Sequence, residues 1–167
     1  LQYGLSFKIL GSLAVILREL KKARWAGHAI TKIVTHTMFN HGWAVILAAN
    51  FLKDIGVLPR DVAVEIGVGK EMSLEQQKKL RKFGDTVIQY ESYEAAKDAA
   101  RRKKEKAPEQ TILVQHYQGV VTGYAAMFLD LYKQLKKKVE DGSLKAKTIG
   151  VVVPVGAGGL IAASKVL

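Results

Sequence analysis

Cysteine is absent from this chain of 167 residues, proline occurs only three times, and acidic residues are scarce relative to basic ones. The lack of cysteine excludes disulfide scaffolds, thiolate zinc sites and cysteine nucleophiles. The four histidines lack metal-type spacing, so no metal is expected. No apolar run approaches the ~20 residues of a membrane-spanning helix, so we expect no membrane insertion. A chain of this length buries roughly 70% of its unfolded surface, which predicts one domain, or one and a part.

Basic charge is abundant: 26 lysines and arginines stand against 15 acidic residues, giving a formal net charge of +11. The cations gather in three segments of helical periodicity, at residues 78–82, 101–106 and 133–138. Solvated outer helix faces explain such clusters, and a surface that binds RNA or an acidic protein is the alternative. No aromatic-rich strand motif or zinc finger accompanies them, so base-specific recognition is not expected.

Hydrophobic periodicity alternates between two kinds of element along the chain. Helical spacing predicts helices at 6–24, 43–52, 73–83, 93–106 and 124–140, with another beginning at 159. Alternating or β-branched runs predict strands at 31–37, 61–68, 85–90, 111–115 and 148–155. Ser73 and Gln76 are spaced as a capping box for the third helix. The fold class is therefore α/β, with mainly parallel twisted sheets and helices on both faces.

A glycine-rich turn stands between the last predicted strand and its helix. Gly156, Ala157, Gly158 and Gly159 would present several backbone N–H groups and a positive helix end at one point, which suits a phosphate. A tight turn with nothing bound is the alternative. Gly67-Val68-Gly69-Lys70 lacks the spacing of the phosphate-binding loop of ATPases, so we predict no such site there.

Lys8 stands at the head of the first predicted helix. The positive end of a helix lowers the pKa of a lysine and favours the neutral amine, which can attack a carbonyl. A solvated surface lysine is the alternative. The turn at Asn40, His41 and Gly42 and the glycine turn would both lie at the carboxyl ends of strands, where ligands of parallel sheets collect.

The order of these features resembles the fold-type II family of pyridoxal 5′-phosphate enzymes, whose fold is tryptophan synthase β-like. The segment Ser6-Phe7-Lys8-Ile9 resembles the family's Ser-Phe-Lys-Ile-Arg-Gly, which implies that Lys8 carries the cofactor. The segment ending in Asn40-His41-Gly42 resembles Ser-Ser-Gly-Asn-His-Gly, which implies that Asn40 lies beside the cofactor's 3′-hydroxyl. The resemblance also implies that Thr37, Met38, Phe39, Asn40 and His41 form the turn for the substrate carboxylate, and that residues 156–159 form the phosphate cup.

Subfamily features are mixed. The lysine segment, the Asn-His-Gly turn and residues 153–156 resemble threonine/serine dehydratases and serine racemase, whereas residues 71–84 and Thr122-Gly123 resemble cysteine synthase and cystathionine β-synthase. The resemblance implies a small mobile domain at 61–118 and a large cofactor domain at 1–60 and 119–167. We expect further residues of a longer protein at one or both ends of the chain.

Departures from the family pattern fall on the carboxylate turn. Met38-Phe39 stands where the family has Ser-Gly, Trp43 replaces a small polar residue, and Leu10 replaces the arginine after Lys-Ile. Phenylalanine restricts the backbone where glycine is free, and methionine supplies no donor. Each charge-assisted hydrogen bond that the substrate carboxylate loses is worth roughly 1.5 to 3 kcal/mol.

Three functions remain open on this basis. The expected one is a homologue of fold-type II pyridoxal-phosphate enzymes, with or without the cofactor, that has impaired or lost catalysis and a structural role in a larger assembly. The second is an active lyase or β-replacement enzyme for serine-, threonine- or cysteine-type amino acids, with Lys8 as the base at the α-carbon. The third is a nucleotide-binding module that uses the glycine cup. We expect a homodimer or a subunit of a larger complex, in the cytoplasm or an organellar matrix.

Overall fold

The computed structural model describes residues 8–83, 86–115, 119–145, 148, 150 and 159–164. Helices and strands alternate along most of this chain. In order they are α1 (Lys8–Trp25), β1 (Lys32–Thr37), α2 (Asn40–Asp54), β2 (Ala63–Gly69), α3 (Leu74–Phe83), β3 (Thr86–Tyr90), α4 (Tyr93–Lys106), β4 (Thr111–Leu113), α5 (Gly119–Glu140) and α6 (Gly159–Ser164). The sequence pattern therefore located most elements to within two residues.

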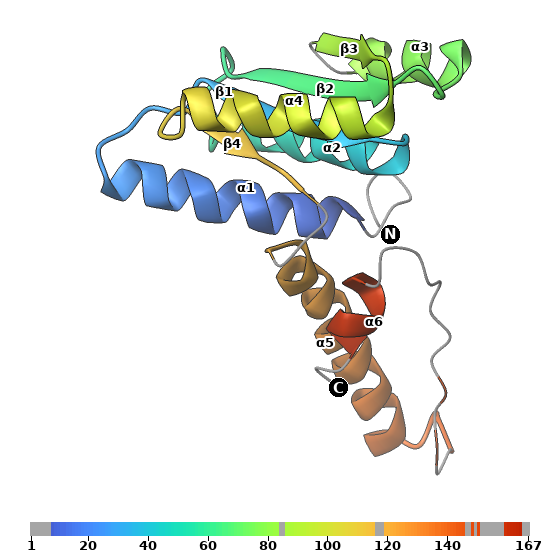
Figure 1. The fold of residues 1–167 in the computed structure, drawn as a ribbon. Helices are drawn as coiled ribbons and strands as arrows, with labels where there is room; N and C mark the ends of the chain where they lie inside the picture. Colours follow the sequence, from blue (N-terminus) through green and yellow to red (C-terminus); the bar gives the residue numbers. More distant parts are fainter. Residues whose placement is uncertain are drawn as a thin grey trace.

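The four described strands form one parallel sheet in the order β3-β2-β1-β4 (Figure 1). β1 lies in the interior of the sheet, with Lys32 opposite Ala63 of β2 on one side and Thr111 of β4 on the other. Parallel neighbours require crossover connections, which the intervening helices provide. The predicted α/β class is confirmed.

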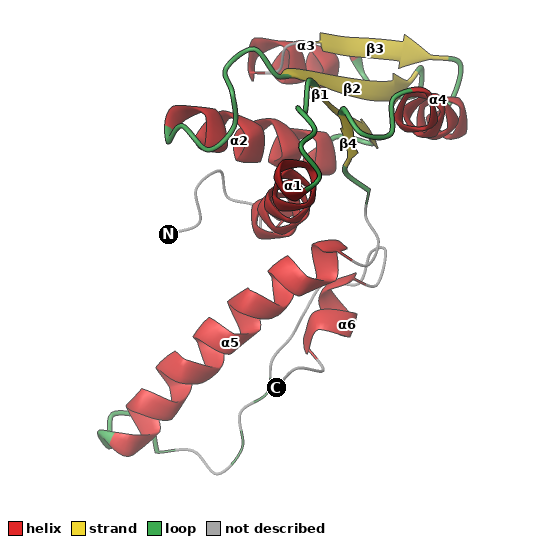
Figure 2. Cartoon of the chain, turned by 90° about the vertical axis from the view of Figure 1, so that its left-hand side faces the viewer, coloured by secondary structure: helices red, strands yellow, loops and turns green. Residues whose placement is uncertain are grey.

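Helices cover both faces of the sheet. Figure 2 shows α4 on one side, with α1, α2 and α3 on the other. α4 is the predicted 93–106 helix, capped by the Ser92 hydroxyl, which accepts the Ala95 N–H at 3.1 Å. α3 begins with the predicted capping box, because Ser73 and Gln76 exchange hydrogen bonds between side chain and backbone. Local sequence signals therefore set these helix starts.

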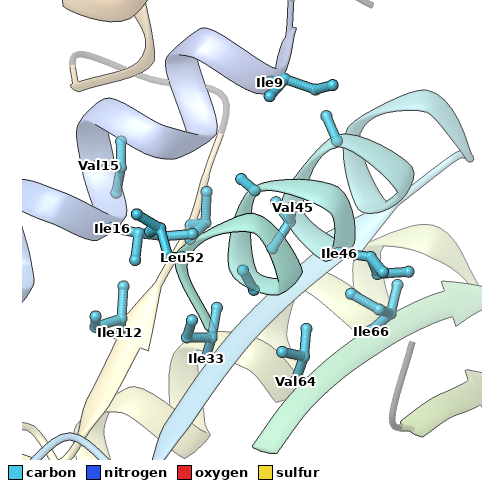
Figure 3. Close-up of a cluster of buried hydrophobic side chains, with 14 of the residues drawn as sticks. Ile9, Val15, Ile16, Ile33, Val45, Ile46, Leu52, Val64, Ile66 and Ile112 are labelled. Atoms are coloured by element: carbon cyan, nitrogen blue, oxygen red, sulfur yellow. The ribbon is translucent and has the colours of Figure 1, made fainter. Parts of the chain in front are cut away.

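The main core lies between the sheet and the two helices α1 and α2. β-branched and aliphatic side chains of the strands meet those of the helices there (Figure 3), and the set includes Val15, Ile16, Ile33, Val45, Ile46, Leu52, Val64, Ile66 and Ile112. α2 is apolar on most sides because it lies between the sheet and α1. Burying each such side chain contributes about 1.5 to 3 kcal/mol.

α5 packs its first half against α1 and α6 and then extends away from the sheet (Figures 1 and 2). It begins at Gly119, five residues before the predicted start at Tyr124. The predicted start lies too far along the chain because the β-branched residues and Gly123 before Tyr124 are weak helix formers. Packing against α1 stabilises the helix there despite this low propensity. Within the described residues, no helix is both long enough and apolar enough to cross a membrane.

The predicted strand at 148–155 lies mostly outside the described residues, and the two that are described, 148 and 150, are not in a strand. The division into a large and a small domain stays a prediction. Its expected boundary at residue 61 falls between β1 and β2, which pair along their whole shared length. Any division must therefore keep these two strands in one sheet.

Candidate functional site

The predicted lysine and the predicted carboxylate turn each stand at the start of a helix. Lys8 is the first residue of α1, and Asn40 is the first residue of α2. Both helices begin at the end of the molecule where β1 and β2 finish (Figure 1). This is the carboxyl edge of the sheet, where ligands of parallel α/β proteins bind.

Lys8 is half-buried, and burial lowers the pKa of its amine from the ordinary value. The direction agrees with the sequence prediction, but the cause is loss of solvent rather than the end of the helix. Burial disfavours the charged ammonium because it removes the water that stabilises the charge. A larger share of the amine is therefore in the neutral, nucleophilic form.

Thr37 ends β1, and its side chain closes the turn that follows. The hydroxyl oxygen accepts hydrogen bonds from the backbone N–H groups of Phe39 and Gly42, each at 2.9 Å. Gly42 fits this arrangement because a Cβ there would lie 2.6 Å from Thr37 Cγ2 and 3.0 Å from Ile66 Cγ2. The strand end and the first turn of α2 are thus in direct contact.

Phe39 precedes α2 and adopts φ 148° and ψ −72°. Glycine tolerates a positive φ of this kind, whereas a residue with a side chain is strained there. Such strain costs on the order of 1 to 3 kcal/mol. Its ring stacks on Trp43 with centroids 6.2 Å apart, and Trp43 meets Phe83 edge-on at 4.8 Å. The turn therefore has a glycine-type backbone at a phenylalanine, and aromatic packing accompanies it. Met38 is 58% exposed.

The residue after β4 ties a second strand end to this turn. The carbonyl of Val114 accepts the Thr35 hydroxyl at 2.7 Å and lies 3.2 Å from Nε2 of the buried His41. His41 thus contributes a contact that fixes the turn against β4. These bonds bring the ends of β1 and β4 and the start of α2 together.

Gln115, the next residue, was missed by the sequence reasoning. Its side-chain nitrogen is buried and finds no hydrogen-bond acceptor among the residues that the structure describes. A buried amide N–H without an acceptor is costly unless a ligand satisfies it. The sequence signal was weak: a polar residue that follows β4 and the buried Val114 at the carboxyl edge.

The predicted phosphate cup is the part of the site about which least is described. Gly156, Ala157 and Gly158 lie outside the described residues, and Gly159 is the first residue of α6. The structure thus brings together Thr37, Met38, Phe39, Asn40 and His41 in one turn. In the described ranges no group of three or more acidic or histidine side chains is arranged to hold a metal ion.

Comparison with known proteins identifies the family. The model of the family described as "Pyridoxal-phosphate dependent enzyme" matches residues 1–164. No curated protein matches the chain. Among solved structures, threonine deaminase isoform 2 from Solanum lycopersicum matches 98% of this chain and 41% of its own, with 24% identity and a TM-score of 0.68. Maize serine racemase matches 96% of this chain and 43% of its own, with 22% identity and a TM-score of 0.68.

Cysteine synthase from Entamoeba histolytica shares the fold as well, over 94% of this chain and 42% of its own, with 19% identity and a TM-score of 0.66. The chain therefore spans less than half the length of these solved relatives. The cofactor of the matched family is pyridoxal phosphate. The family match, together with the parallel α/β fold, shows that the chain belongs to the pyridoxal-phosphate-dependent enzymes of fold type II.

Proposed function

We propose that this chain holds pyridoxal 5′-phosphate on Lys8 but has impaired or lost chemistry on amino acids, and serves a structural role in a larger assembly. One observation carries the proposal. Phe39 occupies a glycine-type backbone position in the carboxylate turn, and its N–H is already bound to Thr37. The turn is therefore stable without a substrate carboxylate.

The donor set fits the cofactor at its aldehyde. The half-buried amine of Lys8 has a pKa lowered by burial, so its neutral form is available to hold an aldehyde. Asn40, at the start of α2, would lie beside the 3′-hydroxyl, and residues 156–159 would hold the phosphate. When bound, this cofactor acts as an electron sink that labilises bonds at the α-carbon of an amino acid.

Carboxylate binding is the step that the altered turn weakens. The N–H of Phe39 donates to Thr37, and Met38 offers no side-chain donor. A buried carboxylate without donors forfeits roughly 1.5 to 3 kcal/mol for each charge-assisted bond. This cost supports impaired amino-acid binding.

An active lyase or β-replacement enzyme for serine-, threonine- or cysteine-type substrates is the second candidate. The buried side-chain nitrogen of Gln115 favours it, because no described acceptor satisfies this donor at the carboxyl edge. In that case Gln115 would bind the carboxylate in place of Met38 and Phe39, and Lys8 would accept the proton from the α-carbon.

Exposed side chains support the structural part of the proposal. From its middle to its end, α5 exposes Leu129, Tyr132 and Val139, which are 43%, 50% and 47% exposed. Such apolar residues on a protruding helix suit contact with a second copy of the chain or with other subunits. The basic outer faces of the helices would suit RNA or an acidic protein at such a contact.

Absorbance and labelling test the cofactor part. Purified chain incubated with pyridoxal 5′-phosphate should gain a visible absorbance band, and borohydride should then fix the cofactor on Lys8, as read by peptide mass spectrometry. Lys8→Ala should remove both signals. Lys21→Ala, which changes an exposed lysine of the same helix, is the matched control. A chain that takes up no cofactor would overturn the proposal.

Amino-acid chemistry is tested separately on the loaded chain. With L-serine or L-threonine we expect little spectral change and little keto-acid product, and the double variant Met38→Ser, Phe39→Gly should bind these amino acids more tightly. Robust turnover by the unaltered chain would favour the active enzyme instead. Migration of the native protein in a large complex supports the structural role, whereas a free dimer with turnover contradicts it.

A further inference from the structure

We propose that Gly123 on α5 and Ser12 on α1 are positioning residues for Lys8, because together they fix the first turn of α1 against α5. The inference rests on the proposed role of Lys8 as the residue that holds the cofactor. Neither residue contacts the turn at 37–41 in the hydrogen bonds described above. Both act on Lys8 through the backbone of α1.

Gly123 marks a direct contact between two helix backbones. A Cβ at this position would lie 2.2 Å from the carbonyl oxygen of Leu10, 2.5 Å from its carbonyl carbon and 2.6 Å from Cα of Gly11. No side chain fits at such distances. Glycine weakens a helix interior, so its presence in α5 is explained by this close packing rather than by helix formation.

The contacted residues follow Lys8 by only two and three positions. Because an α-helix rises about 1.5 Å per residue, Leu10 lies only about 3 Å further along the axis than Lys8. A shift of α5 at Gly123 therefore acts on the turn that carries the lysine. Leu10 and Gly11 present backbone atoms to α5, so the contact leaves little room for adjustment.

Ser12 fixes the same turn from within α1. Its side chain is fully buried, and its hydroxyl donates a 3.0 Å hydrogen bond to the backbone carbonyl of Lys8. Gly11 beside it is buried as well. The carbonyl of Lys8 is thus bound by the Ser12 side chain one helical turn further along α1. Leu10 and Gly11, which lie between them, contact α5.

Large buried side chains keep α5 in place on α1. Tyr124 is 3% exposed and Phe128 is 1% exposed, and both belong to the buried core. They follow Gly123 on α5, so they anchor the helix where its backbone touches α1. We expect the burial of the Lys8 amine, which lowers its pKa, to depend on this packing of the first turn.

The test measures the titration of Lys8 directly in the full chain. Reductive dimethylation with carbon-13 formaldehyde gives each lysine an NMR signal whose shift reports its pKa, and Lys8→Arg identifies the Lys8 signal. Gly123→Ala forces α5 and α1 apart, and Ser12→Ala removes the hydroxyl with little change in volume. Gly150→Ala is the control, because a Cβ there meets no atom of the described residues within 4 Å.

Both variants should raise the pKa of Lys8 toward its ordinary value, which at neutral pH lowers the neutral fraction of the amine. The control and the exposed lysines of α5 should not change. A purely structural role would lower the melting temperature without moving the Lys8 titration. Folded variants that keep the Lys8 pKa of the unaltered chain would overturn the inference. If Gly123→Ala does not fold, the result for Ser12→Ala decides the question.

A failure of the proposed function can be distinguished from a failure of the positioning inference. If borohydride fixes the cofactor on another lysine, the proposed role of Lys8 is wrong, yet the titration still reports whether Gly123 and Ser12 position it. If the cofactor is fixed on Lys8 and the variants leave its pKa unchanged, only the positioning inference fails.

Discussion

Thr37 and Gly42 are joined by a 2.9 Å hydrogen bond between the threonine hydroxyl oxygen and the glycine backbone nitrogen. The bond links the last residue of β1 to the first turn of α2. The same hydroxyl accepts the N–H of Phe39, so one side chain sets the shape of the whole turn. The conformation of the candidate carboxylate site is thus determined from the strand side.

Replacing Thr37 by valine should destabilise the turn. Valine keeps the volume but cannot accept the N–H groups of Phe39 and Gly42, and an unsatisfied buried donor costs about 1 to 3 kcal/mol. Urea unfolding should therefore show a loss of about this size. Thr37→Ser, which keeps the hydroxyl, should lose clearly less. A valine variant as stable as the unaltered chain would contradict the role of the hydroxyl.

Substitutions at Phe39 separate backbone strain from ring packing. Alanine and glycine both remove the ring, but only alanine keeps a Cβ at φ 148°. Phe39→Gly should therefore be more stable than Phe39→Ala by about 1 to 3 kcal/mol, the reverse of their order in ordinary helices. Chemical unfolding of the two variants measures the difference. If alanine is the more stable of the two, the backbone at this position is not strained.

His36 should make stability depend on pH. Burial, followed by the nearby charges of Lys97 and Arg101, lowers its pKa from 6.5 to about 4, against the opposing effect of Glu94 and Asp98. The unfolded chain then binds a proton between these pH values that the folded chain does not. The free energy of unfolding should fall as pH drops from about 6.5 to about 4, by up to ~3 kcal/mol.

His36→Gln removes this titration. Urea unfolding at pH about 7 and about 4.5 should show a smaller loss for the variant than for the unaltered chain, and NMR of the His36 ring should place its pKa directly. Equal losses in both proteins would mean that other groups cause the acid sensitivity.

Glu65 joins three elements through two lysines. Its carboxylate, 15% exposed, pairs with Lys32 of β1 and with Lys103 of α4. Burial raises its pKa, but the two lysines outweigh burial, so the pKa lies below its ordinary value. Stability from this pair is present above the ordinary carboxyl pKa and is lost as pH falls below it.

Glu65→Gln should lower the free energy of unfolding by about 1.5 to 3 kcal/mol, because two partly covered ammonium groups lose their counter-charge. Glu75→Gln is the matched control. Its carboxylate pairs with Lys79 on an exposed helix face, so its loss should not be measurable. Equal effects of the two substitutions would show that position in the fold does not matter for these pairs.

Sequence reasoning located the four described strands, the α4 helix and the turn at 37–41, because alternation, caps and motif order are local signals. It also placed the polar turn at the carboxyl edge. It missed the tight contact of Gly123, since a glycine within a helix does not reveal which backbone approaches it. The late start predicted for α5 has the same origin, because tertiary packing outweighed the weak helix propensity of its first residues.

The pKa of Lys8 illustrates the same division between local and distant effects. Position at a helix start was readable from the sequence, but the burial of the side chain, which lowers the pKa, was not. Gln115 was overlooked because a single glutamine after a strand is an unremarkable pattern until its buried amide is seen without an acceptor in the described part of the chain. Side-chain burial is the information that the sequence pattern lacked.

The packing of α1 on α5 has a consequence for the order of events during synthesis. α1 leaves the ribosome before α5, the helix that packs against its first turn and one of the last described elements. β1 likewise gains its second neighbour only when β4 emerges. Contacts this distant in sequence form late. A nascent or truncated chain that lacks α5 would therefore present the first turn of α1 without this packing partner. With the cofactor on Lys8, as proposed, cofactor capture would then report that synthesis has passed this helix.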